Sequence, residues 1–190
     1  MSVIHRARSG KVYYLHVSSG KNQKVRYYFS LKPDGLLVQS LPNGYEIYET
    51  VNAQVFLRKK QKKLIKDDEL ALVQKALKNH AEEWRYKAEI RKNMIVIHTA
   101  AQDYDWIDML PSASGVNKGK IIEMKNRNTQ YMPVMRFILQ DSEKRLFSPE
   151  RYCFKGSIDD WIPIGEERKL SVLIREYIKH LGKESFFELI

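Results

Sequence analysis

The stretch K-V-Y-Y-L-H-V-S-S-G-K-N-Q-K-V-R-Y-Y-F-S, residues 11–30, decides the fold class. In both of its halves, apolar and aromatic side chains alternate with polar ones at a period of two, which is typical of β-strands. Between the halves, Gly20 and Asn22 tolerate a positive φ angle, so the chain can reverse. The stretch is therefore predicted to be a β-hairpin. Its inward-facing residues would be Tyr13, Leu15, Val17, Val25, Tyr27 and Phe29.

Turn signals place further strands along the chain. Asn43-Gly44 is a strong hairpin signal, and it predicts that residues 36–39 pair with residues 45–49. Lys92-Asn93 likewise indicates a hairpin of residues 84–91 and 94–99. The remaining stretches with strand character are residues 54–60, 120–125, 131–140 and 151–155.

Two segments have helical periodicity. The first is expected to begin at Asp67 or Asp68, either of which can cap it, and to run to about Asn79. The second is expected from about residue 167 to residue 181, where Gly182 can end it. Its apolar stripe follows the spacing of an amphipathic helix without a break and consists of Leu170, Leu173, Ile174, Tyr177, Ile178 and Leu181.

Long β stretches with helices set apart, in place of regular βαβ alternation, indicate an α+β fold with mainly antiparallel sheet. We expect an N-terminal β-meander followed by an α+β portion that ends in the amphipathic C-terminal helix. The two portions would be residues 1–66, basic and β-rich, and residues 67–190, neutral and α+β. They could also form one continuous domain.

The composition is that of a soluble globular protein. With 190 residues, 43% of them hydrophobic, the chain can bury a core without staples. Cys153 is its one cysteine and cannot form an internal disulfide, which fits a reducing compartment such as the cytoplasm. The first residues lack the apolar core of a secretory signal, and no apolar run is long enough to span a membrane.

The charge is distributed unevenly. Residues 1–66 hold thirteen Lys and Arg against three acidic residues, a net of +10, whereas residues 67–190 are balanced. Such asymmetry favours a polyanionic partner, nucleic acid first among them, for the basic part. Cations interleaved with aromatic rings on a sheet suit a phosphate backbone and stacked bases. The candidate nucleic-acid-binding residues are Lys11, Tyr14, Lys24, Arg26, Tyr28, Arg58, Lys59, Lys60, Lys62 and Lys63.

The hairpin residues of this set would face outward together with His16. An alternative interpretation is an ordinary solvated strand surface, since Tyr favours strands and Lys and Arg occur on most exposed faces.

A different chemistry is indicated by Asp103, Asp105 and Asp108, followed by Ile121-Ile-Glu-Met-Lys125. An aspartate followed by a strand with Glu-x-Lys resembles the core of the PD-(D/E)xK nuclease superfamily. The resemblance implies Asp108 (or Asp105) and Glu123 as Mg²⁺ ligands and Lys125 as the catalytic lysine. The alternative is an ordinary cross-strand pair beside an acidic loop. His98, five residues before Asp103, could join a metal or acid–base cluster.

Four of the last five residues, Phe186-Phe-Glu-Leu-Ile190, are apolar. They would dock on the core or form a contact between subunits. The leading hypothesis is a non-enzymatic binding protein for nucleic acid or another polyanion. A Mg²⁺-dependent nuclease and a protein–protein interaction module are the alternatives.

Overall fold

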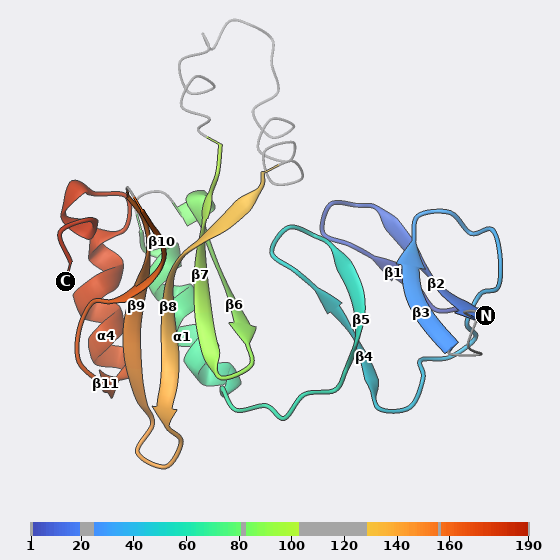
Figure 1. Cartoon of the computed structure of the whole chain (residues 1–190), viewed down its shortest axis with the longest axis horizontal. Helices are drawn as coiled ribbons and strands as arrows, with labels where there is room; N and C mark the ends of the chain where they lie inside the picture. The colour runs from blue at the N-terminus through green and yellow to red at the C-terminus, as the bar shows by residue number, and fades with distance from the viewer. Residues whose placement is uncertain (1, 20–24, 81–82, 103–128, 156, 190) are drawn as a thin grey trace, which may run out of the picture. The chain divides into compact units, whose positions relative to one another are not determined.

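The computed structural model describes residues 2–19, 25–80, 83–102, 129–155 and 157–189. The fold is α+β with antiparallel sheets, as the sequence predicted. The described chain forms two compact units (Figure 1). The first contains the described residues up to Gln61 together with Thr129, and the second contains residues 62–102 and those from Gln130 onward. In the described parts, no helix has the length and apolar character needed to cross a bilayer.

The first unit contains a three-stranded antiparallel sheet in the order β1-β2-β3. Its strands are β1 (Ile4–Arg6), β2 (Val12–Ser19) and β3 (Val25–Ser30). The β2–β3 ladder pairs Leu15 with Phe29 and Val17 with Tyr27, which confirms the predicted hairpin. Leu15 is fully buried and anchors the inner face, which carries the odd-numbered residues of β2.

The connection that follows β3 crosses this sheet. β3 pairs with one edge of β2, but residues 36–38 bond to the other edge: the Val17 amide donates to the Leu36 carbonyl (3.0 Å), and the Val38 amide donates to the Leu15 carbonyl (2.9 Å). β1 covers that edge only as far as Tyr14. Residues 36–38 therefore satisfy backbone groups of β2 that β1 leaves unpaired.

The expected pairing of residues 36–39 with residues 45–49 is wrong for this reason. Instead β4 (Tyr45–Glu49) pairs with β5 (Val55–Lys59) in a separate two-stranded sheet. Glu49 joins the two sheets of the unit: its carboxylate lies 2.8 Å from His5 Nε2 and accepts from the Arg8 amide (2.9 Å). Partial burial raises the pKa of Glu49, but these hydrogen bonds outweigh it and hold the pKa below its usual value.

The second unit is built on the antiparallel meander β10-β9-β8-β7-β6, with β11 beside β9. Its strands are β6 (Tyr86–Arg91), β7 (Met94–Ala100), β8 (Tyr131–Asp141), β9 (Leu146–Lys155), β10 (Ile158–Pro163) and β11 (Arg168–Lys169). The predicted hairpin around Lys92-Asn93 is confirmed, and so are the strands predicted at residues 131–140 and 151–155.

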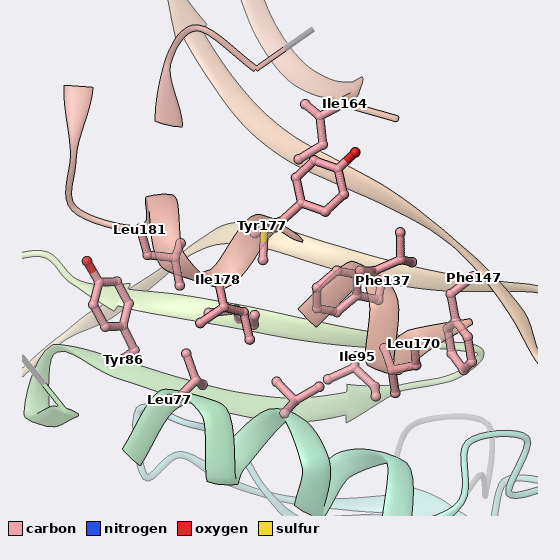
Figure 2. Close-up of a cluster of buried hydrophobic side chains, with 14 of the residues drawn as sticks. Leu77, Tyr86, Ile95, Phe137, Phe147, Ile164, Leu170, Tyr177, Ile178 and Leu181 are labelled. Atoms are coloured by element: carbon pink, nitrogen blue, oxygen red, sulfur yellow. The ribbon is translucent and has the colours of Figure 1, made fainter. Parts of the chain in front are cut away.

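Two helices cover one face of this sheet, α1 (Asp67–Lys78) and α4 (Leu170–Tyr177) (Figure 1). Figure 2 shows their side chains, such as Leu77 and Leu170, meeting Ile95 and Phe137 from the sheet. The short helices η1 (Glu83–Arg85), η2 (Ile178–His180) and η3 (Glu184–Phe186) complete the unit. The other sheet face carries the charged residues of β6 and the alternate residues of β7 to β10.

The α1 N-terminus is fixed by Glu69, not by the expected Asp67 or Asp68 cap. Helix α1 is preceded by Lys66, whose amide donates to Glu69 (2.8 Å). The same buried carboxylate pairs with Arg145, from the turn between β8 and β9. Asp67 and Asp68 lie in the first turn, where their charge favours the helix dipole.

The C-terminal helix begins later than expected. Arg168 and Lys169 form β11 and pair with Phe147 and Leu146 of β9, so α4 starts at Leu170. The predicted apolar stripe does face the core, with Leu173 fully buried, and Gly182 has the positive φ angle (75°) that ends the helical segment. In the tail, Phe186 is buried in the core whereas Phe187 is exposed.

Candidate nucleic-acid interface

The outer face of the first sheet carries an aromatic stack. His16 on β2 and Tyr28 on β3 are directly opposite in the ladder, and their rings stack with centroids 5.2 Å apart and planes 14° apart. His16 is 2% exposed and Tyr28 is 48% exposed. One face of the Tyr28 ring therefore rests on a buried ring, while much of the side chain remains open to solvent.

His16 was expected to point into solvent, and the structure corrects this. The connection that crosses the sheet passes over its ring: His16 Nε2 lies 2.9 Å from the Lys32 carbonyl oxygen. A carbonyl can only accept, so Nε2 carries the proton and donates. Gly35 has a φ angle of +106°, which L side chains rarely adopt, and a Cβ there would lie 3.6 Å from His16 Nδ1. The histidine is thus held in one orientation behind Tyr28.

Cations flank the stack. Arg26 precedes Tyr28 by two residues on the same face of β3, about 7 Å along the strand. Lys32 follows the strand in the segment that holds His16. Both side chains are exposed, and neither forms an ion pair with any described residue. Arg6 lies on the same sheet face, on β1 opposite Val12, and is also exposed.

The other candidate residues of the first unit are not part of this stack. Lys11 is exposed just before β2, and Tyr14 is half-buried beside Ile4. Arg58 is already paired: its Nε donates to Glu46 (2.8 Å), and its guanidinium lies 4.0 Å from the centroid of the Tyr48 ring. Lys59 and Lys60 are exposed at the end of β5.

The basic run is divided between the two units. Lys62 and Lys63 belong to the second unit, where Lys63 pairs with Asp67. Lys24 lies outside the described residues. So do Asp103, Asp105, Asp108, Glu123 and Lys125, the residues of the nuclease resemblance, and with them its Mg²⁺ site. Among the described side chains, no group of three or more His, Cys, Asp and Glu is placed to hold a metal ion.

His98 is a structural histidine at the centre of the second sheet. It is 1% exposed, with Nε2 lying 3.3 Å from an Arg91 guanidinium nitrogen and 3.5 Å from Glu89 Oε1. Arg91 can only donate, so this contact requires an unprotonated Nε2. Burial lowers the pKa of His98 to about 4, Glu89 opposes the shift and Arg91 adds to it. The imidazole is enclosed, and its Nδ1 is buried without a hydrogen-bond partner among the described residues.

A second aromatic group lies on the same face of this sheet, over β8 to β10. Arg136 donates to Glu150 (2.7 Å) and lies 4.2 Å from the centroid of the Trp161 ring, which packs edge-on against Tyr152. Tyr152 in turn donates to Asp159 (2.5 Å). Arg136, the cation of this aromatic group, is paired with Glu150, and Asp159 lies at the edge of the group. The group is therefore a poorer surface for a polyanion than the His16–Tyr28 stack.

Comparisons of the chain with protein-family models, with curated proteins and with solved structures found no match.

The residues that the sequence analysis missed are His16, as a support for Tyr28, and Lys32, as a flanking cation. Nothing in the alternating pattern of residues 11–30 indicates that the chain crosses over β2 after β3.

Proposed function

We propose that this protein binds nucleic acid through the outer face of its first sheet. The observation that carries the proposal is the supported, half-exposed Tyr28 ring with the exposed cations Arg26 and Lys32 near it, neither of which forms an ion pair with a described residue. Cations that contact phosphates release condensed counterions, and this release drives binding without sequence preference. The imbalance of charge in residues 1–66 supports the same interpretation, because a polyanion is the partner that such a surface attracts over a distance.

The structure changes which cations we expect to matter. Arg58 is compensated by Glu46, and Lys63 is compensated by Asp67. Their contribution should be small, because an incoming phosphate must compete with a carboxylate already in place. Arg26 and Lys32 have no such competitor among the residues described. Binding should therefore depend more on these two residues than on the basic run.

The test is a salt titration of nucleic-acid binding, measured by fluorescence anisotropy with labelled oligonucleotides. The double variant Arg26→Gln/Lys32→Gln should bind more weakly. On single strands, its plot of log affinity against log salt should be shallower by about 0.7 for each phosphate that the variant no longer neutralises.

The matched control is Lys75→Gln/Lys78→Gln, which removes two equally exposed charges from helix α1 of the second unit. It should leave both the affinity and the slope close to those of the wild type. No binding by the wild type at low salt would overturn the proposal. If the two double variants weakened binding equally, binding would depend on the total charge of the protein and not on Arg26 and Lys32.

A further inference from the structure

We infer that the ligand is single-stranded nucleic acid and that one unpaired base stacks on the open face of the Tyr28 ring. This inference rests on the proposed function and specifies its ligand. Base–aromatic stacking requires a base that is free of its own neighbours and partner strand. It is also tolerant of sequence, because every base has a π face.

The arrangement of Tyr28 suits this role because the ring is held in place before the ligand arrives. A free tyrosine on a strand would lose side-chain freedom when a base stacked on it. Here the parallel, buried ring of His16 already restricts Tyr28, and His16 is itself fixed by its hydrogen bond to the Lys32 carbonyl. A base would extend the pair to a stack of three rings.

Two exposed cations lie near the stack. Arg26 is two residues before Tyr28 on the same face of β3, and Lys32 belongs to the segment that contacts His16, the ring beneath Tyr28. Phosphates next to a base stacked on Tyr28 would then find cations within reach.

The unit contains a natural control for this inference. Phe56 on β5 is 49% exposed, almost the same as Tyr28. It faces outward beside Tyr48, and the nearest cation on its face is Arg58, which is paired with Glu46. Among the described residues, Phe56 is thus an equally exposed ring that lacks both a buried supporting ring and a neighbouring cation outside an ion pair.

The experiment measures binding of the full chain to oligo-dT, to oligo-rU and to a DNA duplex, at one low salt concentration. Tyr28→Leu keeps an apolar side chain over His16 but removes the π face. It should weaken binding of the single strands about 5- to 150-fold, the usual effect of removing one stacked base. Duplex binding should not change. Tyr28→Phe should bind like the wild type, and so should Phe56→Leu.

Each other outcome separates the inference from the proposed function. If Tyr28→Leu binds single strands as well as the wild type does, or weakens single-strand and duplex binding equally, the stacking inference is overturned while the salt-dependent binding stands. An effect as large in Phe56→Leu or in Tyr28→Phe would also overturn it. Absence of wild-type binding to all three probes would overturn the proposed function itself.

Discussion

The folded structure disfavours protonation of His98. Its ring is 1% exposed, and the groups that face it from β6 are the Glu89 carboxylate and the Arg91 guanidinium. The pKa of His98 falls to about 4 in the folded protein, against an ordinary value of 6.5. Between these two values the unfolded chain takes up a proton that the folded chain refuses, so acid favours unfolding.

The stabilising effect of a neutral His98 should therefore be complete above pH 6.5 and should be lost as the pH falls towards about 4. The loss should approach about 1.4 kcal/mol per pH unit within this window. In His98→Gln, where the amide oxygen can still accept from Arg91, this slope should disappear. Denaturant unfolding at a series of pH values measures it, and identical slopes in the two proteins would contradict the assignment.

For single residues, the sequence predicts the face of a strand on which a side chain lies better than it predicts what packs against that side chain. Alternation correctly placed Arg26 and Tyr28 on the outer face of the hairpin. It placed His16 there too, but the ring is covered by the connection to residues 36–38. That contact joins His16 to Lys32, sixteen residues later in the chain, and no local pattern in the sequence encodes it. Arg58 likewise looked available until the ladder placed Glu46 opposite it.

Among the elements, α1 depends on one ion pair at its beginning. Glu69 accepts from the Lys66 amide, and its carboxylate also binds the Arg145 guanidinium, which donates to the Leu64 carbonyl (3.2 Å). Both side chains are largely buried. Removing either partner leaves the other charge without compensation in a poorly solvated place, and this is costlier than losing an exposed pair.

We expect Glu69→Ala to lower the free energy of unfolding of the second unit by about 3 kcal/mol, and Arg145→Ala to have a similar effect. Their double variant should cost clearly less than the sum of the two, because the second change removes a charge that the first had left unpaired. The control is Asp68→Ala, an exposed acid in the same turn, which should cost less than about 1 kcal/mol. Denaturant unfolding measures all four variants. Additive effects of Glu69→Ala and Arg145→Ala would show that the pair is not coupled.

The elements that were predicted correctly are those with strong local signals. The β2–β3 and β6–β7 hairpins pair strands that are neighbours in the sequence, and the stripe of α4 buries the expected side. The wrong predictions concern segments whose backbone pairs with a strand that is distant in the sequence. Residues 36–38 pair with β2 in place of residues 45–49, and Arg168 and Lys169 pair with β9 in place of extending α4. In both places an open strand edge elsewhere in the fold takes the backbone hydrogen bonds.

At the scale of the whole molecule, each of the two units has a core of its own. Leu15 is fully buried in the first unit and Leu173 is fully buried in the second, where it belongs to the cluster between the helices and the sheet. We expect the two units to unfold separately, so that the stability of the proposed nucleic-acid-binding sheet would not depend on that of the helical core.

The test compares Leu15→Ala with Leu173→Ala, two matched changes at sites with no exposed surface. Each should cost about 2–5 kcal/mol, since a buried leucine leaves a cavity that the surroundings fill only in part. Hydrogen exchange followed by mass spectrometry across a denaturant series resolves the two units. Leu173→Ala should release the amides of β7 and β8 early while those of β2 and β3 keep their protection, and Leu15→Ala should do the reverse. If both variants released both sets of amides together, the units would form a single cooperative fold, and a weakened core in the second unit would then also weaken the proposed nucleic-acid binding by the first.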